Sequence, residues 1–203
     1  MTDPSDVEAR IQTACRAGDH AAAATLAIER YGGEILAFLI ARLRSRSTAE
    51  EVFSMFAEKL WVGLPAFEWR SSMKSWAYRI ARNAANDFVT AAHNRPERNL
   101  DLSQRASLSA LIDRVRSATQ NYRRTEVKDR MRELRETLPQ DDQMLLILRV
   151  DQAMDWRDLA VAMSDPDAPL DDAEVDREAA RLRKRFERVK ERLRDLARGE
   201  GLL

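Results

Sequence analysis

Residues 67–88, FEWRSSMKSWAYRIARNAANDF, combine hydrogen-bond donors with a helical spacing. Arg79, Arg82, Asn83 and Asn86 fall on one side of a helix with 3.6 residues per turn. An Arg guanidinium pairs with phosphates and guanine edges, and an Asn amide pairs with an adenine edge. This spacing predicts a surface that binds a nucleic acid. A solvated polar face on an ordinary amphipathic helix is the alternative.

The other side of the same helix is apolar. Trp76, Ile80, Ala84 and Phe88 recur every fourth residue, which predicts that they hold the helix to its own domain. Before the helix, the loop of residues 67–72 carries Trp69. This indole could stack on an unstacked base or pack on its own domain, and the sequence alone does not choose between the two.

The composition excludes several classes of site. The chain has 203 residues with one Cys and two His, and neither His lies at metal-ligand spacing from Cys15. No Gly-rich phosphate loop or nucleophile–base pair is present, so we predict no catalytic residue, no metal and no cofactor. No apolar run approaches a membrane span and no signal pattern opens the chain, so we expect a cytoplasmic protein without membrane insertion.

Charge is unevenly distributed in the last third of the chain. Residues 139–177 hold eleven acidic side chains and three Arg, a net charge of −8, whereas residues 178–198 have a net charge of +5. This polarity predicts a basic helix presented to a polyanion. A solvated charged helix is the alternative.

The spacing of apolar residues predicts helices and no strands. In a first domain, residues 1–94, we expect helices over 6–17 and 21–31, a break at Gly32-Gly33, a helix from Ile35, and a helix capped at Ser47-Thr48 that ends near Gly63. Residues 95–125 form a linker, which contains Pro96. Apolar spacing within it predicts a helix over 107–122 that packs between the two domains.

The second domain, residues 126–203, is predicted to contain a helix-turn-helix. A helix with Leu134 and Leu138 on one face stops at Pro139, and Asp141 or Asp142 caps the next one. Asp155 caps a supporting helix, and Asp171 or Asp172 caps a longer basic one. A plain helical hairpin would show a similar pattern.

Two parts of the chain together resemble a known family. AEEVFSMFAEKLWVGLPAFEWRSSMKSWAYRIARNAANDF, with the later LPQDDQMLLILRVDQAMDWRDLAVAM and RLRKRFERVKERLRDLAR, resembles an extracytoplasmic-function (ECF) sigma factor. The resemblance places sigma region 2 at residues 30–96 and sigma region 4 at residues 132–198. It implies an all-α fold of two helical domains, a region 2 bundle and a region 4 helix-turn-helix, joined by a partly helical linker. It also implies RNA polymerase core (beta-prime clamp helices and beta subunit), promoter DNA and an anti-sigma factor as partners.

The resemblance assigns functional residues in region 2. Those expected on the beta-prime clamp helices are Glu50, Glu51, Ser54, Met55 and Glu58. Those expected on the −10 element are Trp69, Arg70, Lys74, Arg79, Arg82, Asn83 and Asp87, with the loop of residues 67–72 capturing a flipped base. Ser54-Met55 departs from the family, which has a Gln-acid pair there; Met55 could be an apolar contact at the interface or a core residue.

Four residues of the last helix are expected at the −35 element: Arg181, Arg183, Lys184 and Arg188. Here too the chain departs from the family, because residues 164–178 hold seven acidic side chains and two Pro instead of a short Gly-containing turn. Acidic residues suit a helix N-terminus but repel phosphate. Two other functions stay open at this point: an ordinary helix-turn-helix regulator, and a sigma-like helical interaction protein that does not read promoters.

Overall fold

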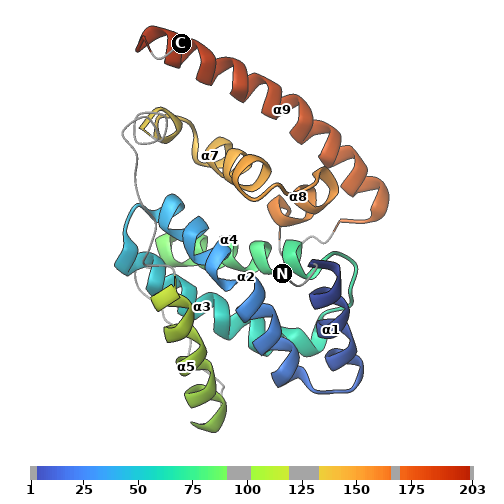
Figure 1. Ribbon diagram of the computed structural model, residues 1–203. Helices are drawn as coiled ribbons and strands as arrows, with labels where there is room; N and C mark the ends of the chain where they lie inside the picture. The colour runs from blue at the N-terminus through green and yellow to red at the C-terminus, as the bar shows by residue number, and fades with distance from the viewer. Residues whose placement is uncertain (1–3, 91–101, 119–132, 166–169, 202–203) are drawn as a thin grey trace. The chain divides into compact units, whose positions relative to one another are not determined.

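Two compact units, residues 1–120 and 121–203, make up the chain in the computed structural model of Figure 1. The structure describes residues 4–90, 102–118, 133–165 and 170–201. Every regular element within these ranges is a helix, so the predicted all-α fold is confirmed. The helices of the first unit are α1 (Pro4–Arg16), α2 (His20–Leu43), α3 (Arg46–Gly63), the 3₁₀ turn η1 (Leu64–Ala66), α4 (Met73–Thr90) and α5 (Leu102–Ala118).

Helix α2 lies at the centre of the first unit and packs against α1, α3, α4 and α5. Phe38 of α2 meets Tyr78 of α4 edge to face, with ring centroids 5.6 Å apart, and both side chains are almost fully buried. Phe53 and Phe56 of α3 are completely buried in the same core. These aromatic contacts fix α4 against α2 and α3.

Polar caps set where the helices begin. The Asp19 carboxylate accepts a hydrogen bond from the Ala22 amide at 2.9 Å and caps α2. Ser45, two residues before the predicted Ser47, caps α3 by accepting from the Thr48 amide at 3.3 Å. Between these helices Arg44 adopts a left-handed conformation, with φ of 54°, and ends α2. Side-chain caps of this kind satisfy amides that have no partner within the helix.

The predicted break at Gly32-Gly33 is wrong, because α2 runs through both residues. A Cβ at Gly32 would lie 3.2 Å from the Phe53 ring and 3.2 Å from a Val115 methyl group. The missing side chain lets α3 and α5 approach α2 closely. Packing of neighbouring helices here outweighs the low helix propensity of Gly.

Helix α5, yellow-green in Figure 1, lies beside α3 and packs on α2 and α3. It begins at Leu102, earlier than the predicted residue 107, and residues 119–122 of the predicted helix lie outside the described ranges. Leu108, Leu111, Ile112 and Val115 are all buried. The helix expected within the linker is therefore part of the first unit.

The second unit contains α7 (Gln140–Leu146), the π-helical η3 (Ile147–Asp151), α8 (Trp156–Met163) and α9 (Asp172–Gly199). The Asp155 carboxylate accepts from the Asp158 amide at 2.9 Å, and Asp171 forms a reciprocal capping box with Glu174, so both predicted caps are confirmed. The predicted acidic cap of α7 is wrong. Pro139 occupies the cap position, and Asp141 and Asp142 lie in the first helical turn.

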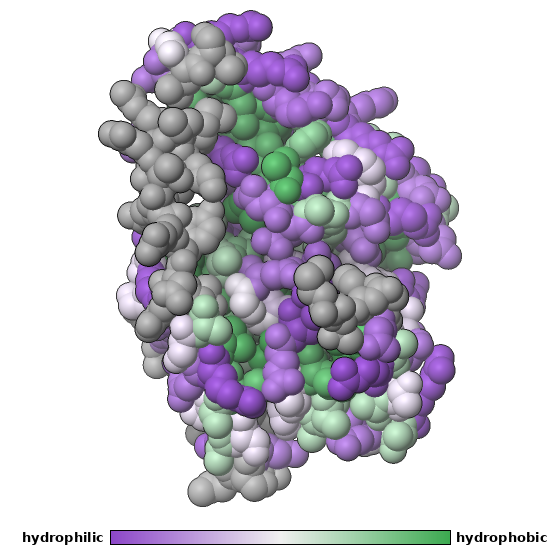
Figure 2. All heavy atoms as spheres, in the orientation of Figure 1, coloured by the Kyte–Doolittle hydropathy of each residue, from purple (hydrophilic) through white to green (hydrophobic). Residues whose placement is uncertain are grey.

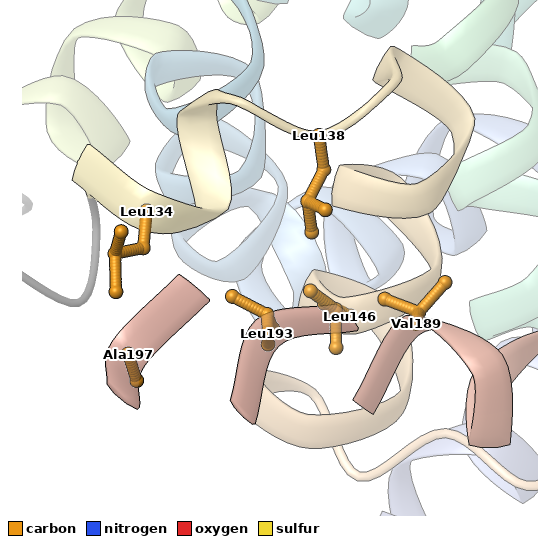
Figure 3. Packing of buried hydrophobic residues seen from close by; sticks show 6 residues of the cluster. All are labelled: Leu134, Leu138, Leu146, Val189, Leu193 and Ala197. Atoms are coloured by element: carbon orange, nitrogen blue, oxygen red, sulfur yellow. The ribbon is translucent and has the colours of Figure 1, made fainter. Parts of the chain in front are cut away.

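One apolar cluster holds α9 to α7 and to the residues just before α7, as Figure 3 shows. Phe186 and Leu196 pack against its edge. One side of α9 faces this cluster, and the opposite side of the helix faces solvent. The cluster consists of Leu134, Leu138, Leu146, Val189, Leu193 and Ala197.

Candidate nucleic-acid interface

The N-terminus of α4 is fixed by α1 and by the preceding loop. The Glu8 carboxylate of α1 accepts from the Met73 amide at 2.6 Å and from the Tyr31 hydroxyl at 3.5 Å. The Ser72 hydroxyl accepts from the Ser75 amide at 3.1 Å, in the manner of an N-cap. These bonds orient the polar side of α4.

We define the α4 polar face as Arg79, Arg82, Asn83, Asn86 and Asp87. Arg79 and Asn83, one turn apart, are both half-buried. Neither forms a side-chain hydrogen bond or an ion pair within the described residues. Burial lowers the pKa of the Arg79 guanidinium below its ordinary value, because a charged group loses water without gaining a counter-charge. A partly desolvated cation beside an uncommitted amide is prepared for an external anion or a base edge.

Two more residues of the α4 polar face, Asn86 and Asp87, are tied to neighbouring helices. The Asn86 side-chain oxygen Oδ1 accepts from the Arg42 guanidinium of α2 at 2.7 Å. The Lys59 ammonium of α3 binds the Asp87 carboxylate. Asp87, which the resemblance assigns to the −10 element, is therefore paired with a Lys. These contacts fix the far half of α4 and neutralise the acid next to Asn83.

The loop before α4 carries a stack of aromatic rings. The Phe67 ring lies on Trp76, with centroids 4.5 Å apart and planes at 19°, and Trp69 contacts the other rings through Phe67 at 4.9 Å. Trp69 is half-buried and has a φ of 57°, in the left-handed region that costs an aromatic residue energy. The indole thus packs on its own domain. Arg70 beside it is exposed.

We define the α3 outer face as Glu50, Glu51, Ser54, Met55 and Glu58, all of which are half-buried. On the inner side of α3, Val52, Phe56 and Leu60 are completely buried. Helix α5 covers part of the outer face. Ser54 and Glu58 line a hollow of about 260 Å³ whose other walls belong to α5.

In the second unit, exposed cations run along the outer side of α9, the hydrophilic ridge in Figure 2. Arg177, Arg181, Lys184 and Arg188, spaced by four, three and four residues, form what we call the α9 basic stripe. Arg183 lies off this stripe, with its guanidinium 5.8 Å from the centre of the Trp156 ring.

The acidic first turn of α9 is paired with a cation of α8. The Arg157 guanidinium donates to the Asp172 carboxylate at 3.0 Å and also binds Asp176. Asp171 and Glu174 form the capping box. Two of the seven acidic side chains that the sequence places ahead of the α9 basic stripe are therefore paired with one Arg within the unit.

Comparison with known proteins finds a match for part of the first unit. The family model for sigma-70 region 2 matches residues 27–95, which include most of α2, all of α3 and α4, and the aromatic loop. Over these residues the chain is similar to sigma-70 region 2. It is also 26% identical over 145 residues to the RNA polymerase sigma-H factor of Pseudomonas aeruginosa, covering 70% of this chain and 75% of that protein.

The two matches support an RNA polymerase sigma factor. An ordinary helix-turn-helix regulator is not favoured, because that function would leave the matched region without a role. Sigma factors are regulators of transcription initiation rather than enzymes. Within the described residues there is no cluster of three or more potential metal ligands and no helix long and apolar enough to span a membrane.

The structure brings together some of the region 2 residues predicted to contact the −10 element and separates others from them. The α4 polar face brings together Arg79, Arg82, Asn83 and Asp87. Lys74 lies apart from them, with its ammonium 3.7 Å from the Glu34 carboxylate of α2. Arg82 also has a partner within the protein.

Sequence reasoning missed Lys59, Arg42 and Arg157, whose partners lie on other helices. The spacing of residues along the chain gives no sign of pairs between helices. It also missed Arg177, which a signal could have found, because it lies four residues before Arg181.

Proposed function

We propose that this sigma factor is of the ECF type, binds core RNA polymerase, and recognises both promoter elements. In this proposal the α3 outer face meets the beta-prime clamp helices, the α4 polar face and the loop of residues 67–72 meet the −10 element, and the α9 basic stripe with Arg183 meets the −35 element. The beta subunit and an anti-sigma factor are further proposed partners. A cytoplasmic location follows from this function, because the polymerase and the promoter are there.

The single observation that carries the proposal is the burial of Arg79 and Asn83 without side-chain partners. Both are half-buried, one turn apart, and without a side-chain partner in the described ranges. Burying polar groups without partners costs free energy that an interaction with a ligand can recover. An Arg fork suits a phosphate or guanine, and the Asn amide suits an adenine edge.

Initiation by such a protein needs no catalytic group. Removing a base from the DNA stack costs a few kcal/mol, which contacts to the flipped base and to phosphates must offset. The rings of Phe67, Trp69 and Trp76 supply an aromatic surface next to the α4 polar face. A base that leaves the duplex would find stacking partners there.

Contacts to the −35 element would begin with charge. The α9 basic stripe is exposed over three helical turns, and Arg157 pairs two of the acidic side chains near its start, Asp172 and Asp176. Cations of this kind anchor the helix on phosphates and carry little sequence information. Sequence preference would come from whichever side chains of α9 reach the base edges.

Run-off transcription tests the proposal on a promoter mapped from transcript start sites after overexpression. Arg79→Ala and Asn83→Ala are each compared with the wild type and with Arg16→Ala, which removes an exposed cation from α1. We expect both α4 variants to lose at least tenfold in promoter opening and to retain binding to core polymerase. Arg16→Ala should behave as the wild type.

Two results separate the remaining functions. No association of the wild-type protein with purified core polymerase would exclude the proposed function. Normal association combined with unchanged transcription by both α4 variants would remove the α4 polar face from promoter recognition. That second result would favour a sigma-like interaction protein.

A further inference from the structure

An amphipathic helix from the predicted linker occupies the α3 outer face. The apolar side of α5 carries Leu108, Leu111, Ile112 and Val115, of which Leu111 is 2% exposed and Leu108 is 3% exposed. These side chains pack against α2 and α3 of the same unit. Burial on this scale is typical of a docked helix rather than of a free tether.

Gly32 shapes the surface on which α5 docks. The two methyl groups of Val115 lie 3.2 and 3.3 Å from the position that a Cβ at Gly32 would occupy. A side chain at this position would push α5 away from α2. The Gly inside α2, which sequence reasoning took for a helix break, thus gives α5 room to approach.

Arg116, at the end of α5, anchors the helix to α3. Its guanidinium donates to the Glu50 carbonyl at 2.6 Å and to the Ser54 hydroxyl at 2.8 Å. The Arg46 guanidinium of α3 in turn donates to the Arg116 carbonyl at 3.3 Å. Ser54 lies where the family resemblance leads us to expect a Gln, so the substituted side chain is one that α5 uses.

The α5–α3 contact is also incompletely packed. The hollow of about 260 Å³ lies between the two helices, bordered by Ser54 and Glu58 on α3 and by Ser109 and Ile112 on α5. The Arg116 Nε atom is buried without an acceptor among the described residues. A hollow that opens to solvent adds no contacts and an unsatisfied donor weakens an interface, so release of α5 costs less free energy than its apolar burial alone implies.

We propose that α5 is an intramolecular cover of the polymerase-binding surface and that it must leave α3 before core polymerase binds. The proposal rests on the proposed function, which gives the α3 outer face to the clamp helices. Three of the five residues of that face, Glu50, Ser54 and Glu58, bond to α5 or border the hollow beneath it. The apparent affinity for polymerase is then reduced by the fraction of molecules in which α5 is released.

A reversible lock tests the cover directly. Gly32→Cys with Val115→Cys puts one thiol on each helix and removes the two Val115 methyl groups that a Cβ at residue 32 would crowd, and Cys15→Ser removes the native thiol. We expect the oxidised protein to bind core polymerase at least tenfold more weakly than the same protein after reduction. The reduced form is the matched control, because its sequence is identical. Failure of the two thiols to cross-link under oxidation would contradict a docked α5.

A second variant releases α5 without new cysteines. Arg116→Ala removes both hydrogen bonds to α3, and we expect it to bind core polymerase about fivefold more tightly than the wild type. Arg114→Ala is the matched control. It also removes an Arg from α5, but this Arg is largely exposed and forms only a 3.5 Å ion pair with Glu29, so little change is expected.

The outcomes separate the cover from the proposed function. Equal polymerase binding by the oxidised lock, the reduced lock and Arg116→Ala would overturn the cover and leave the proposed function standing. No binding of polymerase by any form, the wild type included, would overturn the proposed function itself. Should the lock fail to fold, Arg116→Ala against Arg114→Ala decides alone, and equal affinities would reject the cover.

Discussion

The carboxylate of Asp87 on α4 is bound by the ammonium of Lys59 on α3. This ion pair joins two helices that the proposed function gives to different partners, α3 to polymerase and α4 to the promoter. It also removes an uncompensated negative charge from the neighbourhood of Asn83. Lys59 is therefore expected to act through Asp87 as a positioning residue.

Replacing Lys59 by Ala should weaken promoter complexes about three- to fivefold, because the released Asp87 charge would repel DNA phosphates. The stability of the protein should change by less than about 1 kcal/mol, since both side chains are roughly half exposed. Filter binding and urea unfolding measure the two effects. Lys59→Ala combined with Asp87→Ala should recover most of the lost affinity; no recovery would mean that Asp87 itself contacts a base.

Arg157 should support binding to the −35 element without touching DNA. Arg157→Ala leaves Asp172 and Asp176 unpaired ahead of the α9 basic stripe. We expect a three- to tenfold loss of affinity for a −35 duplex, measured by fluorescence anisotropy, because like charges then face the phosphates. Adding Asp172→Asn and Asp176→Asn to this variant should restore binding. If the triple variant binds as weakly as Arg157→Ala, Arg157 itself contacts DNA.

Local signals predicted the helices well and their mutual contacts poorly. Asp155 and Asp171 were identified as caps because a cap is read from residues that are close in the chain. The continuity of α2 through Gly32 was not predicted, since it depends on Phe53 and Val115, which come from two other helices. The same limit applies to the candidate site. Lys59 and Asp87 are 28 residues apart, and their pairing exists only once α3 and α4 have packed.

The α9 basic stripe should set the salt dependence of DNA binding. Lys184→Ala and Arg188→Ala should each reduce the slope of log affinity against log salt by about 0.9 if each residue neutralises one phosphate. Titrations of a −35 duplex at several salt concentrations measure the slope. Arg185→Ala is the control, because Arg185 bonds Asp142 of α7 at 2.6 Å and lies off the stripe. An unchanged slope in both stripe variants would place the phosphates elsewhere.

The backbone and the ring of Trp69 make separable contributions. Its φ of 57° favours Gly, whereas its ring contacts Phe67 at 4.9 Å. Trp69→Ala loses the ring and keeps a Cβ in the left-handed region, so it should be less stable than Trp69→Gly by about 1 kcal/mol in urea unfolding. Both variants should open a promoter less well than the wild type, as permanganate reactivity of unpaired thymines measures, while Trp69→Phe should retain most of the opening. Full opening by Trp69→Gly would show that the indole serves only to pack the loop.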